Sequence, residues 1–376
     1  MRTGTAERET ISRDEAFARI RLLRSPNVGP VSFAQLMRRF GDAMSALEAL
    51  PDLAARGGKP YRAAPTDRVE AEIAAVKKAG ARYLFHDSPD YPGLLSQLES
   101  APPVLTVRGS LEVASRPCVA MVGARNCSAA AVKLAREFAQ NLAESGFVVV
   151  SGLARGIDGA AHAGALAARQ GGAGTVGVIA SGIDIAYPPE HADLQERIAN
   201  EGLLVAEQPP GTEPLARHFP SRNRIIAGLA AGTLVVEAAP KSGSLITARL
   251  AGESGREVMA IPGSPLDSRS QGCNQLIRDG AVLVQSPEDV IELLSGFDGA
   301  IRSSFRESAA HYTADDEPAA QDPADIGGLL TTAPVAIDEL IRQSGEPTAA
   351  VQLALLELEL AGQLVRHAGG RVSLSS

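Results

Sequence analysis

The chain has 376 residues, of which 45% are hydrophobic, 21% charged and 4% aromatic, and its formal net charge is −8. This composition excludes wholesale disorder, and the length predicts about two or three domains. The acidic balance argues against a protein that coats duplex DNA with a basic surface, although it permits a local basic site. The 3 cysteines form no CxxC pair. They predict reduced thiols in a cytoplasmic protein, without a disulfide framework or a cysteine zinc site.

The N-terminal part is predicted to be helical. Residues 1–10 are expected to form a loose tail, and the segment has no apolar core of a signal peptide. Residues 11–55 show apolar spacing typical of helices, interrupted by Ser25-Pro26-Asn27-Val28-Gly29-Pro30. This loop resembles a helix-hairpin-helix, in which amides at a helix start hold a DNA phosphate, with Asn27 in place of a second glycine. A packed helical bundle that does not touch DNA is the favoured alternative.

Residues 68–297 are predicted to form the main domain, after a linker at 56–67. Short apolar, β-rich runs alternate there with helical patterns, which predicts a mostly parallel, doubly wound α/β sheet of the extended Rossmann-like type. The expected strands are residues 81–85, 104–107, 118–122, 147–150, 175–179, 203–206, 233–236, 257–261 and 281–284. No apolar stretch is long enough to cross a membrane.

The C-terminal part is predicted to be a winged helix. Residues 298–325 lose periodicity and are expected to form a linker to a domain at 326–376. Helices are predicted at 337–343 and 349–361, with Thr348 as an N-cap, followed by a hairpin at 364–374 around two glycines. The second helix has no Lys or Arg and carries two glutamates. We therefore expect it to contact protein or to regulate, rather than to read DNA.

Loops that follow five of the predicted strands are rich in glycine, and most carry arginine or lysine. They lie at residues 123–126, 151–158, 180–184, 207–224 and 237–244. In a doubly wound sheet such loops meet at one edge, where glycine lets amides approach an anion and helix starts add positive partial charge. Arginine adds bidentate phosphate recognition. The pattern predicts a phosphate-binding crevice, and it matches neither a Walker loop nor a GxGxxG fingerprint.

Catalytic interpretations of these loops are weaker. Ser151, Asp158 and His162 can be written as a triad, but no nucleophile elbow accompanies them, so a structural role is favoured for Asp158 and His162. Glu237 at a strand end is expected to accept hydrogen bonds from arginines or loop amides, with catalysis as the alternative. No metal-ligand motif is present, and no cofactor is predicted.

Taken together, the loops resemble the DNA-processing protein A family (DprA/Smf). The resemblance covers about residues 81–285 and rests on these segments: VAMVGARNCS (119–128), VVSGLARGIDGAAHAGAL (149–166), SGIDIAYPPEH (181–191), FPSRNRIIAGL (219–229), EAAPKSGSLITARLA (237–251) and IPGSPLDSRSQGCNQLIRDGA (261–281). It implies a protein that binds single-stranded DNA and is not an enzyme. It further implies that the protein shields DNA in natural transformation, helps to load the recombinase RecA, and forms homodimers through the Rossmann core.

The resemblance also assigns residues. Arg125 matches the arginine of the family's Gly-Ser-Arg phosphate loop, with Gly123 as its glycine and Ala124 in place of the serine, so that main-chain amides would remain for phosphate. Phe219 resembles the aromatic residue that contacts bases. Of Arg222 and Arg224, one is expected to face DNA and the other to pair with Glu237. The full predicted DNA- and phosphate-binding set is Gly123, Ala124, Arg125, Ser151, Gly152, Arg155, Gly156, Arg217, Phe219, Arg222, Arg224, Lys241, Ser242, Gly243 and Ser244.

Two other functions compete with this one. A Rossmann-like nucleotide phosphoribohydrolase would also use glycine-rich phosphate loops, but its Pro-Gly-Gly-x-Gly-Thr run is absent, and Lys241–Ser244 stands in the comparable place. A scaffold with a vestigial crevice would bind no DNA. A phosphate crevice with few aromatics predicts sequence-tolerant binding of single strands, weakened by salt with a slope near −0.7 per phosphate.

Overall fold

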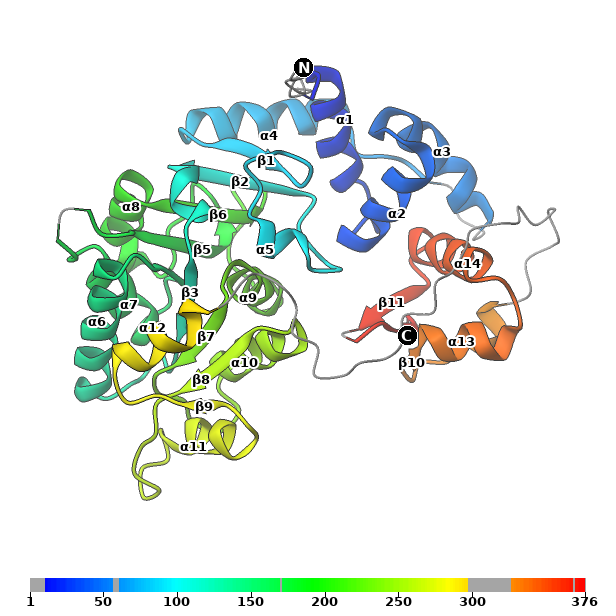
Figure 1. Ribbon diagram of the computed structural model, residues 1–376. Helices are drawn as coiled ribbons and strands as arrows, with labels where there is room; N and C mark the ends of the chain where they lie inside the picture. The colour runs from blue at the N-terminus through cyan, green and yellow to red at the C-terminus, as the bar shows by residue number, and fades with distance from the viewer. Residues whose placement is uncertain (1–10, 57–60, 170, 297–325, 368, 376) are drawn as a thin grey trace, which may run out of the picture. The chain divides into compact units, whose positions relative to one another are not determined.

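The computed structural model describes residues 11–56, 61–169, 171–296, 326–367 and 369–375 (Figure 1). The predicted tail, the predicted linker 298–325 and part of the predicted linker 56–67 lie outside these ranges. The chain divides into two compact units, one of Met1–Ala71 with Glu307–Ser376 and one of Glu72–Arg306. The N-terminal helices and the winged helix, which the sequence assigns to separate domains, therefore share one unit.

The larger unit is built on a nine-stranded sheet with the order β1-β2-β6-β5-β4-β3-β7-β8-β9. Its strands are β1 (Arg82–Phe85), β2 (Val104–Gly109), β3 (Cys118–Val122), β4 (Val148–Ser151), β5 (Thr175–Gly182), β6 (Leu203–Gln208), β7 (Gly232–Val235), β8 (Glu257–Ala260) and β9 (Val282–Leu283). The strands from β3 to β9 pair in parallel, and β2 and β1 add antiparallel beside β6. The nine predicted strands and the mostly parallel α/β fold are confirmed.

The strand order creates a switch point beside β3. The chain adds β4, β5 and β6 on one side of β3, and then adds β7, β8 and β9 on the other. Every residue of β3, β4 and β5 is buried, as expected for continuously apolar strands that are covered on both faces. Ligands of such sheets bind beyond the carboxyl ends of the strands, at the switch point.

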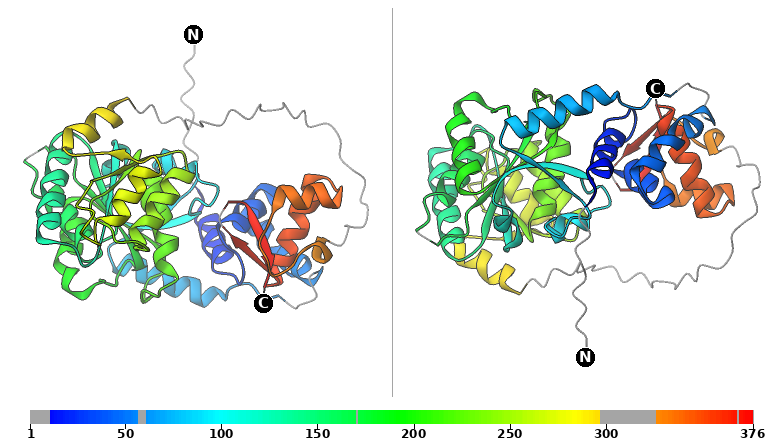
Figure 2. Two further views of the ribbon diagram at one scale, coloured as in Figure 1. Left: turned by 90° about the horizontal axis from the view of Figure 1, so that it is seen from below. Right: turned by 90° about the horizontal axis from the view of Figure 1, so that it is seen from above.

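Helices cover both faces of the sheet (Figures 1 and 2). One apolar cluster joins the sheet to α6, α7 and α12, and another joins it to α5, α9, α10 and α11. The helices are α4 (Thr66–Lys78), α5 (Gly93–Ser96), α6 (Ala129–Glu144), α7 (Ile157–Ala165), α8 (Ala192–Glu201), α9 (His218–Leu229), α10 (Gly243–Glu253), α11 (Gln271–Arg278) and α12 (Pro287–Ser295), with short 3-10 turns η1 (Leu111–Ser115) and η2 (Pro189–His191).

The smaller unit combines three N-terminal helices with a winged helix. Its elements are α1 (Arg13–Leu23), α2 (Pro30–Phe40), α3 (Ala43–Arg56), η3 (Ile326–Leu329), β10 (Val335–Ala336), α13 (Ile337–Ser344), α14 (Thr348–Leu360), β11 (Leu364–His367) and β12 (Arg371–Leu374). The predicted hairpin is present as β11 and β12, and β10 extends it to a three-stranded sheet that the sequence did not predict. The N-cap prediction for Thr348 is wrong, because Pro347 takes that position and Thr348 is already helical.

Within the described ranges, no helix is long and apolar enough to cross a membrane. The same residues contain no cluster of three or more His, Cys, Asp or Glu side chains placed to hold a metal ion.

Candidate functional site

The loop after β3 is fixed to the end of β7 by Glu237. The carboxylate of Glu237 accepts hydrogen bonds from the Ser128 amide at 2.9 Å and from the Ser128 hydroxyl at 2.7 Å. The Ser128 hydroxyl in turn accepts a hydrogen bond from the Ala131 amide, which caps α6. The predicted alternative, an arginine paired with Glu237, is wrong. Glu237 instead positions the loop across the switch point.

The amide of Ala124 is not available to a phosphate. It donates to the main-chain carbonyl of Glu237 at 2.7 Å, which corrects the expectation that all amides of this loop stay open. The amides of Arg125 and Asn126 make no hydrogen bond in the described part of the chain. They are therefore the main-chain donors that the loop can offer to an anion.

Arg125 is exposed and holds no carboxylate. Its guanidinium carbon lies 4.8 Å from the ring centroid of Phe219, in cation–π contact. Among the described residues its side chain makes no hydrogen bond or ion pair. An aromatic ring thus holds a cation without neutralising its charge.

The loop after β4 depends on glycine at two positions. A Cβ on Gly152 would lie 1.5 Å from Nη1 of Arg222, so only glycine lets that guanidinium pass. Gly156 has a φ of +75°, and a Cβ there would lie 2.3 Å from the carbonyl oxygen of Ala124. Ser151 is fully buried, and its hydroxyl donates to the carbonyl of Met121 at 2.6 Å. A DNA contact from the Ser151 side chain is therefore wrong.

Arg222 forms the buried cationic floor of the site. It is 5% exposed and donates through Nη1 to the carbonyl of Val178 at 2.9 Å. Burial lowers its pKa to about 10, against the opposing effect of the nearby Asp158 carboxylate. Burial also raises the pKa of Asp158, while Arg222 and the amides of Ala154 and Gly152 lower it. The two side chains compensate each other electrostatically beneath the surface.

Arg224 points away from this floor. It donates to the carbonyl of Ser100 and forms an ion pair with Glu207. Both partners of the pair are largely buried, with side-chain exposures of 15% and 16%. The sequence left open which of the two arginines faces the crevice, and the structure selects Arg222. Arg224 has a structural role, with Glu207 rather than Glu237 as its partner.

A hollow of about 40 Å³ lies above Arg222. Its lining residues are Arg125, Gly152, Ala154, Arg155, Ala180, Tyr187, Pro188, Pro214, Phe219 and Arg222. Arg155 is exposed at the rim and forms an ion pair with Glu190. The hollow therefore brings together five of the predicted site residues, from the loops after β3 and β4 and from the first turns of α9.

Tyr187 belongs to the site and was missed. Its side chain is 42% exposed, and its ring centroid lies 5.9 Å from that of Phe219, with the planes tilted by 58°. The signal was available, because Tyr187 follows β5 in a segment already singled out by the resemblance. A loop aromatic at the carboxyl edge of the sheet is a candidate for stacking on a ligand.

Two groups of predicted residues do not line the hollow. Arg217 is exposed and precedes α9. Lys241 to Ser244 begin α10, where the hydroxyls of Ser242 and Ser244 lie 2.8 Å apart. The side-chain amide of Asn223 donates to the Gly243 carbonyl at 3.3 Å, which ties this helix start to α9. The group thus lies next to the hollow, beyond α9.

The residues of the possible triad do not act together. His162 is fully buried, and its Nδ1 lies 2.8 Å from the Thr175 hydroxyl. Burial lowers the pKa of His162 to about 3, so the ring is neutral at physiological pH. The Ser151 hydroxyl is bound to Met121 instead. These contacts agree with the structural roles predicted for Asp158 and His162.

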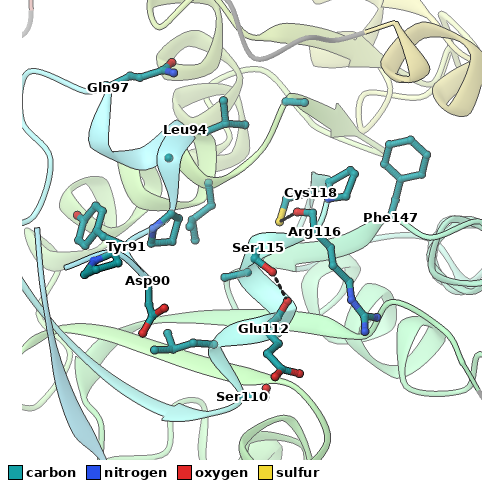
Figure 3. Close-up of a pocket in the computed structure, with 18 of the residues that line it drawn as sticks. Asp90, Tyr91, Leu94, Gln97, Ser110, Glu112, Ser115, Arg116, Cys118 and Phe147 are labelled. Carbon is teal, nitrogen blue, oxygen red and sulfur yellow. Dashed lines mark hydrogen bonds between the residues drawn. The ribbon is translucent and has the colours of Figure 1, made fainter. Parts of the chain in front are cut away.

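A much larger cavity, of about 1210 Å³, opens at the opposite, amino edge of the parallel strands (Figure 3). Arg82, Asp90, Glu112 and Arg116 bring both signs of charge to its walls. None of the predicted site residues lines this cavity.

Comparisons with known proteins match three successive segments of the chain. A family model described as DNA recombination-mediator protein A matches residues 82–295. Models described as a DprA-like N-terminal HHH domain and a DprA winged helix domain match residues 13–75 and 310–370. The N-terminal match favours the helix-hairpin-helix, which was the less favoured of the two interpretations of that segment.

Individual relatives extend the comparison. Protein Smf of Escherichia coli is 37% identical over 331 residues, which cover 86% of this chain and 85% of the relative. DNA processing protein DprA of Streptococcus pneumoniae is 49% identical over 201 residues, covering 54% of this chain and 70% of the relative. An X-ray structure of DprA from that species covers 75% of this chain and 98% of its own, with a TM-score of 0.62. A DNA processing protein A structure from Helicobacter pylori, which concerns a single-stranded DNA binding mode, is 28% identical, covers 57% and 95% of the two chains, and has a TM-score of 0.51.

Proposed function

Because the chain belongs to the DNA recombination-mediator protein A family, we propose that it binds single-stranded DNA in the hollow between Arg125, Tyr187 and Phe219. The observation that carries the proposal is the exposed guanidinium of Arg125, which pairs with no carboxylate among the described residues and lies above the buried cation Arg222. The Helicobacter pylori relative, whose structure concerns single-stranded DNA binding, supports the choice of ligand.

The DNA backbone is held by charge and main-chain amides. Arg125 offers a bidentate guanidinium. The amides of Arg125 and Asn126, which make no hydrogen bond in the described part of the chain, add main-chain donors from the same loop. Arg222 lines the floor of the hollow, and because its charge is balanced by the buried Asp158, the exposed cation that is left without a carboxylate among the described residues of the site is Arg125. The start of α10, with open amides at Gly243 and Ser244, extends the phosphate track beyond the hollow.

Bases are held by stacking. Tyr187 and Phe219 line the hollow with ring centroids 5.9 Å apart and planes tilted by 58°, and Arg125 lies over the Phe219 ring. An unpaired base can stack on these side chains, whereas a base inside a duplex cannot leave its neighbours without unstacking. Stacking is tolerant of sequence, so we expect single strands to bind more tightly than duplex and with little base preference.

The site is proposed to bind and not to catalyse. A phosphoribohydrolase needs a free carboxylate beside the phosphate loops, whereas the nearby acids Asp158, Glu190 and Glu237 are engaged, Glu190 by Arg155 at the rim. Asp158 is buried beside Arg222, and Glu237 holds Ser128. Release of free base from nucleoside monophosphates is the measurement that would revive the enzyme alternative.

Partners are proposed on the same basis. The loading of RecA onto bound DNA and a role in natural transformation follow from the family resemblance alone. For the homodimer through the Rossmann core, β9 supplies a physical reason, because it is one of the two edge strands of the sheet, the other being β1. Its apolar residues Val282 and Leu283 are 38% and 45% exposed. A Leu283→Lys variant should shift the core-mediated dimer toward monomer in light scattering.

The test is fluorescence anisotropy with labelled oligo-dT, at about 50 and about 200 mM salt and with matched duplex as competitor. Arg125→Ala should raise the Kd about 10- to 100-fold, as expected when a charged hydrogen bond of ~1.5–3 kcal/mol is lost. Arg197→Ala is the matched control, since Arg197 is an exposed arginine that pairs with Glu201 on α8. Equal binding by the Arg125→Ala variant and the wild type would overturn the site.

A further inference from the structure

The winged-helix element α14 takes part in two hydrophobic cores. Val351 and Leu355 pack into the core of the winged helix itself. Leu356 and Leu360, on another side of α14, are 2% and 1% exposed and pack with residues of α1, α2 and α3. The buried apolar residues of α14 thus serve two protein contacts. Its partly exposed polar side chains, Gln352, Glu357 and Glu359, include no Lys or Arg that would favour DNA.

The hairpin loop between α1 and α2 meets the last turn of α14. Asn27 has a φ of +60°, a conformation usually reserved for glycine that asparagine also tolerates. Its side-chain amide donates to the carbonyl of Leu360 at 2.9 Å. Asn27 thus meets the backbone demand of the missing glycine and adds a hydrogen bond that glycine lacks. A Cβ on Gly362 would lie 3.1 Å from the same amide nitrogen, so the chain after α14 also approaches closely.

A further polar contact joins α2 to α14, and another closes the hairpin loop from within the N-terminal segment. The side-chain amide of Gln35 on α2 donates to Gln352 on α14 at 2.8 Å. The Tyr61 hydroxyl donates to the carbonyl of Pro26 at 2.6 Å and closes another side of the loop. Both figures show α14 beside α2 and α3 within this unit (Figures 1 and 2).

We propose that α14 is an intramolecular cap on the helix-hairpin-helix, and that it keeps the hairpin loop from DNA while the two are joined. The electrostatics fit this role. The amino end of α2, which follows the loop, carries positive partial charge, and the carboxyl end of α14 carries negative partial charge. The Leu360 carbonyl accepts the side-chain amide of Asn27, and the last turn of α14 thereby brings its negative end to the loop, against the approach of a phosphate.

One of the acids of α14 is accounted for in the same way. Glu359 accepts a hydrogen bond from Arg366 of β11 at 2.8 Å, and both side chains are about 15% exposed. Glu359 and Arg366, one of the few basic side chains of the winged helix, thus neutralise each other. This inference does not depend on DNA binding at Arg125.

Hydrogen exchange of the full chain tests the contact. Leu356→Asp places a charge between the two cores, and should speed amide exchange in α2 and α3 at least about tenfold, because opening exposes them. Protection of β11 and β12 shows in the same experiment that the winged helix still folds. Asn27→Gly keeps the backbone conformation but deletes the bond to Leu360, and should give a smaller acceleration of α2. Unchanged exchange in α2 and α3 for both variants would overturn the contact.

DNA binding tests the shielding. In an Arg125→Ala background, where the core hollow is disabled, Asn27→Gly and Leu356→Asp should each increase binding of a labelled duplex, in a salt-sensitive manner, by about fivefold or more. The matched control is Gln343→Ala on α13, whose side chain contacts Glu339 within the winged helix. If the opened variants bind duplex no better than the control, the shielding is overturned, whatever the outcome at Arg125.

Discussion

The two edges of the nine-stranded sheet present opposite kinds of cavity. At the amino edge a space of about 1210 Å³ is lined by arginines and carboxylates together. At the carboxyl edge a hollow of only about 40 Å³ gathers Arg125, Arg155 and Arg222 around two aromatic rings. The larger cavity has the volume of a ligand site, whereas the smaller one has the chemistry of an anion site. Volume alone favours the amino edge, whereas the chemistry of the lining supports the site proposed at the carboxyl edge.

The difference follows from the direction of the helices. In this topology α6, α7 and α10 begin beyond the carboxyl ends of β3, β4 and β7, so their positive ends meet at that edge. The amino edge receives the carboxyl ends of helices, which carry negative partial charge. The arginines at the carboxyl edge therefore reinforce a field that the backbone already creates, and this comparison can be tested in both directions.

The largest expected difference between the two edges is in stability, when one glycine at each edge is replaced by alanine. Gly152→Ala should displace the guanidinium of Arg222 and leave Asp158 buried without its cation, at a cost of ~3–5 kcal/mol in the free energy of unfolding of the core. Gly93→Ala at the amino-edge cavity meets no atom within 4 Å and should change stability by less than about 1 kcal/mol. Urea unfolding, followed through protection of the β3 and β4 amides, measures both. Equal costs would contradict the role given to Arg222.

A charge reversal on each edge should separate the two cavities in DNA binding. Arg125 and Arg116 are both exposed, and neither guanidinium pairs with a carboxylate in the described part of the chain. Arg125→Glu should weaken oligo-dT binding by about 100-fold or more, because it removes a charged hydrogen bond and adds repulsion. Arg116→Glu should change the Kd less than about twofold, apart from long-range effects that salt removes. Anisotropy titrations of the two variants in parallel measure both Kd values. A comparable loss of affinity in both would mean that DNA does not bind specifically at the carboxyl edge.

The same contrast explains what the sequence could predict. The nine strands followed from apolar runs, and the carboxyl-edge loops followed from the rule that glycine and arginine after successive strands meet. These are local or topological properties. The choice between Arg222 and Arg224 was not predictable, because the partners of Arg224 are Ser100 and Glu207, which reach it only through the packing of distant segments.

The sequence could not predict which main-chain amides are already hydrogen-bonded. The Ala124 amide looked open in a glycine-rich loop, and it is taken by the carbonyl of Glu237, more than a hundred residues later. The capping of the hairpin loop by Leu360 is a contact of the same kind. In each case the residue type predicts that a hydrogen bond can form, whereas its partner depends on tertiary contacts.

A smaller effect is expected from the buried layer below the carboxyl edge, through pH. The pKa of His162 is lowered from 6.5 to about 3 in the folded state. Between these two pH values the unfolded chain binds a proton on His162 and the folded chain does not. Stability should therefore fall as the pH drops below 6.5, by about 1.4 kcal/mol per pH unit, or ~2 kcal/mol at about pH 5. His162→Gln should remove this part of the pH dependence. Urea unfolding of both proteins at pH values near 7 and near 5 gives the difference; identical slopes would show that His162 is not buried neutral.

The smallest effect is expected from the residue that the sequence analysis missed. Tyr187→Ala should weaken oligo-dT binding by about fivefold, near the lower end of the stacking range of ~1–3 kcal/mol, since half of its surface is already in solvent. Tyr187→Phe keeps the ring and should bind normally. Because the Tyr187 and Phe219 rings touch, the double variant with Phe219→Ala should lose less than the product of the single losses. Additive losses in anisotropy would mean that the two rings hold separate bases, and that the strand runs across the hollow instead of into it.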